Sequence, residues 1–402
     1  MLNPSLALLA SIAGILILIR LKLNPCLAIL AGSLILSLLV LPLHSIPDLM
    51  LQTLLTHQTL RLLAVVACAL TLACLMELNG LLAKLAAMME RIGPRLAMCL
   101  TPAVIGLVPM PAGALVSATT LRNLVKRLGL TPEQATFINY WFRHIWEYSL
   151  PVYPAVITAS VLLSAPLSSV VTTLLPMTVL ATAFGAISSY RILKLKKPPE
   201  IKEKASKNTV RDFLSASWPV LLLVSLILLG LDAVIVFPLT LALLALQQRA
   251  KRPELKQSFK YGLDPKILLM LYAVMLYKAT IESSGTAYAL LSDMQSIRLP
   301  ALVIIAAVPF LMGFATGVAV AFVGIAFPLL IPFIISDLGV NSYVLLLAYT
   351  SGEVGLLLSP VHLCFILSAE YFKANLAKVY KYILPPLLAI EAIAVFIYYI
   401  GI

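Results

Sequence analysis

Apolar stretches long enough to cross a lipid bilayer recur along the whole chain, and they restrict its fold more than any other feature. A transmembrane helix needs about 20 mostly apolar residues, and residues 25–43, 60–78 and 384–400 are such stretches. Only 11% of the residues are charged, against about 25% in soluble domains. We therefore expect an all-α polytopic membrane protein with about ten spans. Residues 6–19 are interpreted as the first span, because no basic leader of a signal peptide precedes them.

The positive charge falls in short loops between the apolar stretches, among them residues 122–127 and 249–266, and residues 44–59 are expected to be a further polar connection. The net charge is +12, but this placement indicates membrane orientation, and we expect no nucleic-acid partner. When the crossings are counted, 25 of the 29 Lys and Arg residues lie on the side of residues 191–211, and only Arg61, Arg143, Lys278 and Arg298 fall elsewhere. By the positive-inside rule that side is cytoplasmic, so both chain ends are expected outside.

Residues 139–154, NYWFRHIWEYSLPVYP, place three ionisable side chains in an apolar region. On a helix, Arg143 and Glu147 are i,i+4 neighbours and His144 and Glu147 are i,i+3 neighbours, so all three share a face. Pro151 removes a backbone donor and clashes one turn back, which predicts a broken helix over residues 133–163. Ionisable groups in a bilayer cost roughly 2.5–3.5 kcal/mol each and usually mark a function. The alternative is an ion pair that only stabilises the fold.

Two further apolar segments are interrupted. Residues 96–121 contain Pro-Met-Pro-Ala-Gly at 109–113, which cannot continue one helix, and each arm is too short to span. A re-entrant hairpin with its tip at 109–113 is predicted, since bare backbone at that depth must lie beside protein or a watery cavity. Residues 300–335, broken at 313–317, are predicted to form a second hairpin. Residues 342–367 are predicted to form a second broken helix, interrupted near Gly352, Gly355 and Pro360.

Features of the first half recur in the same order at offsets of 204 to 206 residues. The matched pairs are Glu77 and Glu282, Gly80 and Gly285, Pro94 and Pro300, Gly113 and Gly317, Glu147 and Glu353, and Pro154 and Pro360. This predicts two repeats, residues 1–190 and 212–402, joined by a cytoplasmic linker at 191–211. Each half has about five spans plus one hairpin, and an odd number of crossings inverts the second half. Inverted repeats with hairpins and broken helices are typical of secondary transporters.

Residues 106–118 (GLVPMPAGALVSA) and 139–148 (NYWFRHIWEY) resemble domain-of-unknown-function family 401, a family of prokaryotic membrane proteins, over essentially the whole chain. Residues 313–330 (GFATGVAVAFVGIAFPLL) look like its second-hairpin motif. The family is grouped with the ion transporter superfamily of carboxylate, gluconate and related anion carriers. The resemblance implies an elevator-type carrier of the prokaryotic inner or plasma membrane, often a homodimer, whose hairpin tips hold the substrate. Sodium-coupled dicarboxylate carriers of the superfamily place Ser-Asn-Thr at both tips, and this chain departs from that pattern.

We expect the substrate site where both hairpin tips and both helix breaks meet. Arg143 suits a carboxylate because its guanidinium offers five donors in one plane, and tip amides at a helix start suit an anion. The alternatives are a permanent Arg143–Glu147 pair and glycines needed only for their backbone angles. The expected substrate-binding residues are Pro109, Met110, Pro111, Ala112, Gly113, Asn139, Arg143, His144, Gly313, Ala315, Thr316, Gly317, Thr350, Ser351 and Gly352.

Glu147 and Glu353 occupy equivalent repeat positions and are the expected ion-coupling residues. A carboxyl group desolvated by apolar neighbours can carry a proton, or both can be fixed partners of Arg143 and backbone donors. His144 either relays protons or is a hydrogen-bonded core histidine, and His362 is interpreted as isolated. The five cysteines lie in apolar segments without a CxxC pair, and we expect neither disulfides nor a metal site.

The sequence thus predicts a secondary active transporter, a symporter, of a small organic anion such as a carboxylate or sugar acid. No cofactor is expected beyond the coupling ion, H⁺ in preference to Na⁺. The alternatives are an intramembrane enzyme using His144 and Glu147, a carrier of amino acids or other solutes, and a channel. An enzyme is not favoured, since the chain lacks the HExxH, GxSxG and P-loop motifs. Two opposed hairpins suit alternating access better than a channel.

Overall fold

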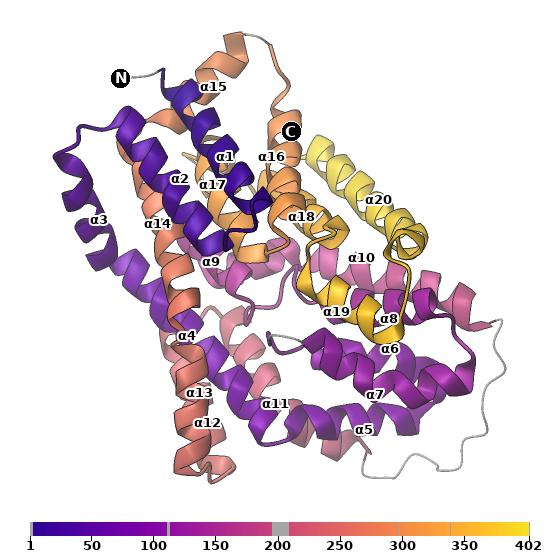
Figure 1. Ribbon diagram of the computed structural model, residues 1–402. Helices are drawn as coiled ribbons and strands as arrows, with labels where there is room; N and C mark the ends of the chain where they lie inside the picture. Colours follow the sequence, from indigo (N-terminus) through magenta and orange to yellow (C-terminus); the bar gives the residue numbers. More distant parts are fainter. Residues whose placement is uncertain (1–2, 111–112, 195–208, 297, 338, 402) are drawn as a thin grey trace.

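The computed structural model describes residues 3–110, 113–194, 209–296, 298–337 and 339–401, and most of them are helical (Figure 1). The helices of the first half are α1 (Pro4–Arg20), α2 (Pro25–Val40), α3 (Ser45–Leu55), α4 (His57–Leu78), α5 (Leu81–Ile92), α6 (Pro94–Ile105), α7 (Gly113–Leu128), α8 (Pro132–His144), α9 (Pro154–Leu162) and α10 (Leu167–Lys194). Those of the second half are α11 (Thr209–Leu228), α12 (Ala233–Gln247), α13 (Arg252–Gly262), α14 (Pro265–Ser284), α15 (Thr286–Ser296), α16 (Ala301–Thr316), α17 (Ala319–Ile334), α18 (Ser342–Leu358), α19 (Leu363–Phe372) and α20 (Leu376–Ile400).

Six helical stretches in the described residues are long and apolar enough to cross a membrane, which confirms a multi-pass, helical membrane protein. They comprise α4, α10, most of α11, α13 with α14, α18 with α19, and α20. The expected spans α1, α2 and α12 contain 17, 16 and 15 residues. At 1.5 Å per residue they are about 22–26 Å long, shorter than a hydrocarbon core of about 30 Å. A two-residue antiparallel pair, β1 (Ile335–Ser336) with β2 (Gly339–Val340), is the one exception to the helical fold in the described ranges.

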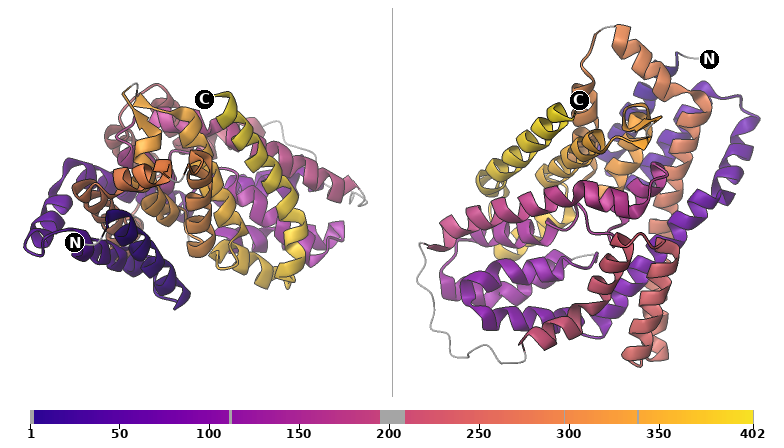
Figure 2. Two further views of the ribbon diagram at one scale, coloured as in Figure 1. Left: turned by 90° about the horizontal axis from the view of Figure 1, so that it is seen from above. Right: turned by 180° about the vertical axis from the view of Figure 1, so that it is seen from behind.

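Helix α17 lies at the centre of the molecule. Residues 320–330 are all buried, and the helix contacts α9, α14, α16 and α18. A helix that is apolar on every side is covered either by protein or by lipid, and the contacts of α17 show that protein covers it. On one flank α2 packs on α14, and α4 packs on α12 and α13; on the other, α6, α7, α8 and α19 pack together (Figures 1 and 2). The N-terminal end of α1 and the C-terminal end of α20 both lie in the upper half of Figure 1, and the turn between α12 and α13 lies at the opposite end of the molecule.

Several segments predicted as loops are helical. The basic residues 122–127 belong to α7, because Leu121, Leu124 and Leu128 continue its buried face. The basic connection 249–266 contains α13, whose first turn holds a proline and whose Lys251 amide donates to the Glu254 carboxylate at 2.9 Å. Helix α3 lies within the expected polar connection 44–59. Helix α10 continues to Lys194, past the expected end of the first repeat at 190, and residues 195–208 of the linker lie outside the described residues.

Both predicted broken helices are interrupted, the first around the expected Pro151 and the second around the expected Pro360, but not at Gly352 or Gly355. Helix α8 ends at His144 and α9 begins at Pro154, so the interruption begins before the kink expected from Pro151. Helix α18 continues through Gly352 and Gly355 to Leu358, and α19 begins at Leu363. The expectation of a break at these two glycines is therefore wrong. The interruption lies around Pro360, which cannot continue a helix.

The glycines of the second half serve close helix packing. A Cβ atom at Gly313 would collide with the Gly352 carbonyl, and one at Gly355 would collide with the Phe310 carbonyl. These residues allow α16 and α18 to approach each other closely. Consequently the turn between α16 and α17 is confined to Gly317 and Val318, and Gly313 and Ala315 are helical. The expectation of a break beginning at Gly313 is wrong for this reason.

We expect Gly355→Ala to lower the stability of the protein by about 1–3 kcal/mol, because an added methyl group in a close-packed contact forces the two helices apart. Thermal unfolding of the purified protein measures this change. Leu311→Ala on α16 is the control, since Leu311 is 51% exposed and its loss removes little packing within the chain. Equal melting temperatures for wild type and Gly355→Ala would contradict the close contact.

Candidate functional site

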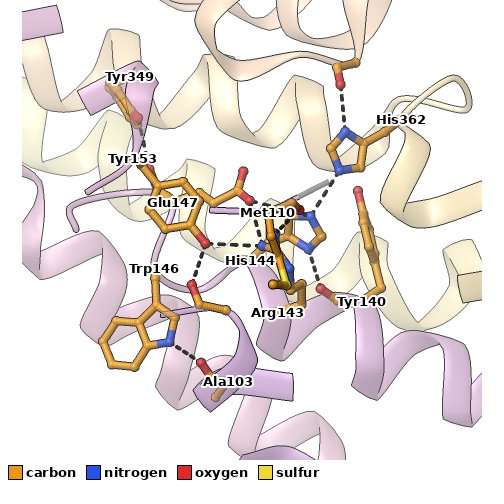
Figure 3. A network of polar contacts seen from close by, with 12 residues as sticks. Ala103, Met110, Tyr140, Arg143, His144, Trp146, Glu147, Tyr153, Tyr349 and His362 are labelled. Atoms are coloured by element: carbon orange, nitrogen blue, oxygen red, sulfur yellow. Dashed lines mark hydrogen bonds and ion pairs between the residues drawn. The ribbon is translucent and has the colours of Figure 1, made fainter. Parts of the chain in front are cut away.

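Arg143 lies near the end of α8 and is 3% exposed. Its Nη1 atom donates to Glu147 Oε1 at 3.1 Å and to the Tyr153 hydroxyl at 3.2 Å. Its Nη2 atom donates to the Met110 carbonyl at 3.4 Å (Figure 3). The sequence predicted the pair with Glu147 from helical spacing, although Glu147 itself lies beyond the end of α8. The guanidinium thus connects the end of α8, the following 145–153 segment and the turn before α7.

The turn between α6 and α7 is held against this guanidinium. A Cβ atom at Gly113 would lie 2.9 Å from Arg143 Nε, so only glycine fits there without a shift. The Tyr153 hydroxyl donates to the Gly106 carbonyl at 2.5 Å. Pro109 and Met110 are buried and non-helical, whereas Pro111 and Ala112 lie outside the described residues. The described residues on either side of the first predicted tip, Met110 and Gly113, therefore lie against the Arg143 guanidinium.

The turn between α16 and α17 is connected to His144, the next residue of α8. Gly317 has a left-handed φ of +62°, and a Cβ atom there would lie 3.0 Å from His362 Cα. The His362 Nδ1 atom lies 2.7 Å from the Gly317 carbonyl, and its Nε2 atom lies 3.0 Å from His144 Nε2. Both predicted tips are thus connected to adjacent residues, Arg143 and His144, through side-chain contacts (Figure 3).

Glu147 joins the first half of the site to α18. Its Oε1 atom lies 3.7 Å from His144 Nε2 in addition to the contact with Arg143. Its backbone carbonyl accepts a hydrogen bond of 2.9 Å from the Tyr349 hydroxyl. Because the carboxylate faces a guanidinium at 3.1 Å, its negative charge is compensated inside the protein.

Glu353, its predicted repeat equivalent, has a different environment. It is fully buried, and within the described part of the chain neither carboxyl oxygen has a hydrogen-bond partner. The Thr350 hydroxyl is likewise buried and unpartnered, and the Ser351 hydroxyl donates to Glu391 Oε1 at 2.5 Å. An isolated buried carboxylate is strongly disfavoured, so the protonated form suits this position.

The remaining predicted residues have structural contacts. The Asn139 amide donates at 2.9 Å to the Ala114 carbonyl and at 2.9 Å to the Ser368 hydroxyl, which connects α7, α8 and α19. The Thr316 hydroxyl donates to the Met312 carbonyl at 2.7 Å, one helical turn back. Gly313, Ala315 and Gly352 lie inside helices, apart from the turn itself.

Sequence reasoning missed His362, Tyr153 and Lys278. The interpretation of His362 as isolated is wrong, because its ring contacts His144. A usable signal was present, since His362 stands two residues after Pro360 in a segment predicted to be broken. Lys278 is a second buried cation, 5% exposed, and its Nζ atom donates to Gln58 Oε1 at 3.0 Å. Lys278 lies near the end of α14, and its Nζ atom is also 3.4 Å from Glu282 Oε1.

Comparison with known proteins gives one family and one related fold. A family model described as "Protein of unknown function (DUF401)" matches residues 3–402. The structure is similar to the crystal structure of the Alcanivorax borkumensis YdaH transporter, with a TM-score of 0.65 over 98% of each chain and 14% sequence identity. At this identity the likeness concerns the fold. No curated protein matched the sequence.

We expect Arg143→Met and Glu147→Met each to destabilise the protein by about 3–5 kcal/mol, because each change leaves its buried partner uncompensated. The double variant should lose much less than the sum of the two, since neither charge remains. Unfolding of the four proteins measures this coupling as a double-mutant cycle. Additive losses would show that the two side chains do not stabilise each other.

Proposed function

The chain belongs to the family described as "Protein of unknown function (DUF401)" over residues 3–402, and from this premise and its fold we propose that it is a secondary active transporter. The proposed substrate is a small organic anion, a carboxylate or sugar acid, carried by an elevator-type alternating-access movement. The proposed location is a prokaryotic inner or plasma membrane, with both chain ends outside and two copies forming a homodimer. The name of the similar structure, a transporter, supports this class of function.

Inverted repeats are supported by the order of the helices. In the described residues, the helices of the second half, α11 to α20, follow the same order as α1 to α10 of the first half. Gly80, after α4, and Gly285, after α14, both adopt left-handed φ angles. Contacts between the halves also occur in exchanged pairs. When each helix is replaced by its equivalent in the other half, ten labels away, one contact becomes another observed contact. The contact α2–α14 becomes α12–α4, α7–α19 becomes α17–α9, and α8–α20 becomes α18–α10. A two-fold relation between the halves produces this exchange.

The elevator movement is supported by the division of helix contacts. Helices α2, α4, α12, α13 and α14 contact one another on one flank, which suits a fixed scaffold. The turns between α6 and α7 and between α16 and α17 are connected to Arg143, His144 and His362, so these parts can move as one body. Alternating access in transporters with inverted repeats is largely rigid-body movement around one site.

The observation that carries the proposal is the convergence of two turns and two helix interruptions on Arg143 and His144. Unwound backbone at membrane depth is tolerated where it lines a cavity or is covered by protein. A guanidinium there offers planar, two-pronged binding to a carboxylate. Three of its five N–H groups donate to Glu147, Tyr153 and Met110. The Nε atom is buried and has no partner in the described residues, so the Nε–H and the second Nη2 hydrogen remain for a substrate carboxylate.

We expect Arg143→Lys to abolish saturable anion binding, because a lysine keeps the charge but loses the two-pronged geometry. A thermal-shift screen of carboxylates and sugar acids on the purified protein identifies the ligand. Counterflow of the labelled ligand in liposomes then distinguishes a carrier from a channel. Arg61→Lys is the matched control. Arg61 lies outside the site, and its Nη1 atom is 2.8 Å from Asp232 Oδ2. Wild-type counterflow in Arg143→Lys would exclude substrate contact by Arg143.

Proton coupling is proposed for Glu353 in preference to Glu147. Both were expected to couple transport to an ion, but Glu147 has a fixed cationic partner and Glu353 has none. A carboxyl group without a counter-charge can gain and lose a proton as its surroundings change during transport. The tips lack Ser-Asn-Thr, which also favours H⁺ over Na⁺.

We expect Glu353→Gln to abolish uptake driven by a pH gradient while counterflow continues, because the amide imitates the protonated acid and cannot release a proton. Uptake of the identified anion into liposomes with an acidic outside, compared with counterflow, separates the two activities. Glu370→Gln is the control, as Glu370 is exposed on α19. Gradient-driven accumulation by Glu353→Gln would remove Glu353 from the mechanism.

A further inference from the structure

Two buried imidazole rings point their Nε2 atoms at each other. They belong to His144, at the end of α8, and His362, just before α19, and the two Nε2 atoms are 3.0 Å apart (Figure 3). The opposite ring nitrogens face carbonyl oxygens, His144 Nδ1 at 2.6 Å from Tyr140 and His362 Nδ1 at 2.7 Å from Gly317. A carbonyl only accepts hydrogen bonds, so each Nδ1 carries a hydrogen.

This assignment leaves both Nε2 atoms as acceptors when the rings are neutral. Two lone pairs that face each other across 3.0 Å repel, and a cation between them removes the repulsion. Backbone carbonyls that fix the Nδ1 hydrogens are also the usual outer partners of metal-binding histidines, because they set the tautomer and the ring orientation. The tautomers, the ring orientations and the carbonyl partners of His144 and His362 are therefore those expected of two metal-binding histidines.

A third ligand lies beside the two rings. The Cys364 sulfur and the two ring nitrogens lie within 4.8 Å of one another, and Cys364 is partly exposed. In the described residues this is the one group of three such side chains that could hold a metal ion. The nearest carboxylate is Glu147, whose Oε1 atom lies 3.7 Å from His144 Nε2.

We propose that His144, His362 and Cys364 bind a transition-metal ion of the Zn²⁺ class, with Glu147 near enough to serve as a fourth ligand. Nitrogen and thiolate ligands in this combination suit Zn²⁺ and exclude hard cations such as Mg²⁺ and Ca²⁺. A tetrahedral ion with Zn–N distances of about 2.0–2.1 Å places two ligand nitrogens about 3.3 Å apart. The observed 3.0 Å is close to this value, so a small movement of the rings and of the sulfur completes the site.

The local charges compensate part of the charge of a bound dication. Arg143 is the nearby cation, and it is already paired with Glu147 at 3.1 Å. The Cys364 thiol loses its proton when it binds a metal, which adds one negative charge to the site. The thiolate offsets one positive charge of the ion, and the Glu147 carboxylate is shared between the ion and Arg143. The ion, Arg143, Glu147 and the thiolate together then carry a net charge of +1, so one of the two charges of the ion is left without a fixed partner.

The site connects parts of the chain that are distant in sequence. His144 belongs to the first half, and His362 is held by the carbonyl of Gly317 in the turn between α16 and α17. A bound ion therefore fixes the end of α8 to that turn and to the interruption before α19. This inference goes beyond the proposed transport of an anion and does not depend on it, because metal binding is measured without a transport substrate.

The test is Co²⁺ binding to the full-length protein, purified with a tag that contains no histidine and placed in lipid nanodiscs. We expect about one Co²⁺ per chain and an absorption band from thiolate-to-cobalt charge transfer. Cys364→Ser should abolish the band, and His362→Gln should weaken Co²⁺ binding by about 10-fold or more. Zn²⁺ should displace Co²⁺, raise the melting temperature of the wild type, and protect Cys364 from maleimide alkylation.

Two matched controls separate this site from background binding. Cys99→Ser removes another partly exposed cysteine, and the double variant His44→Gln/His57→Gln removes the remaining histidines of the chain. Both should bind Co²⁺ like the wild type. Melting temperatures of the metal-free variants establish that they are folded, and alkylation of Cys364 in the wild type reports on the site without any substitution at it.

Three outcomes overturn the proposal. The first is a folded wild type that takes up no Co²⁺ or Zn²⁺. The second is a thiolate–cobalt band that persists in Cys364→Ser. The third is a nitrogen NMR spectrum at neutral pH that shows a proton shared between the two rings and does not change when Zn²⁺ is added. In that case the cation between the two lone pairs is H⁺.

Discussion

The buried guanidinium of Arg143 is the interaction on which the centre of the molecule depends. A charge that is 3% exposed in a chain of this hydropathy needs compensation, and Glu147 supplies it at 3.1 Å. Its other hydrogens reach Tyr153 and the Met110 carbonyl, two parts of the backbone that are not helical. The guanidinium therefore supplies hydrogen-bond donors to the irregular segments, and these segments supply acceptors to the guanidinium. The carbonyl freed by the turn needs a donor, and the guanidinium needs acceptors that apolar helices do not offer.

The helix interruptions follow from residue chemistry at a few positions. Proline at 151, 154 and 360 prevents a continuous helix, and Gly317 permits a left-handed turn against His362. Glycine also has a second use, since Gly313 and Gly355 bring α16 and α18 into close contact without any turn, and Gly352 leaves room for the Phe322 ring of α17. At the site, proline thus contributes to the helix interruptions, and glycine contributes both a turn at Gly317 and the close approach of α16 and α18. Elsewhere proline is accommodated inside helices, as at Pro328 and Pro332 of α17.

Much of the fold was predictable from the sequence, because apolar length and proline position act locally. The membrane class, the interrupted helices and the Arg143–Glu147 pair follow from spacing within one segment. The exact breaks did not, since Gly352 and Gly355 resemble helix breakers and only their contacts with α16 reveal their packing role. Contacts between distant segments were also missed. His144 and His362 are separated by 218 residues, and no local pattern indicates that their rings meet.

The proposed repeat is symmetric in backbone but not in chemistry, and this difference provides a physical basis for coupling. In the alignment of the halves, Arg143 corresponds to Tyr349, His144 to Thr350 and Glu147 to Glu353. The first half thus keeps a cation one turn before its glutamate. The second half has a tyrosine there, and its hydroxyl binds the Glu147 carbonyl rather than Glu353. Glu147 therefore has a cation at 3.1 Å, whereas neither carboxyl oxygen of Glu353 has a hydrogen-bond partner among the described residues. In the proposed repeat, one position thus holds an ion pair in the first half and, in the second half, a buried carboxyl group that has no partner among the described residues.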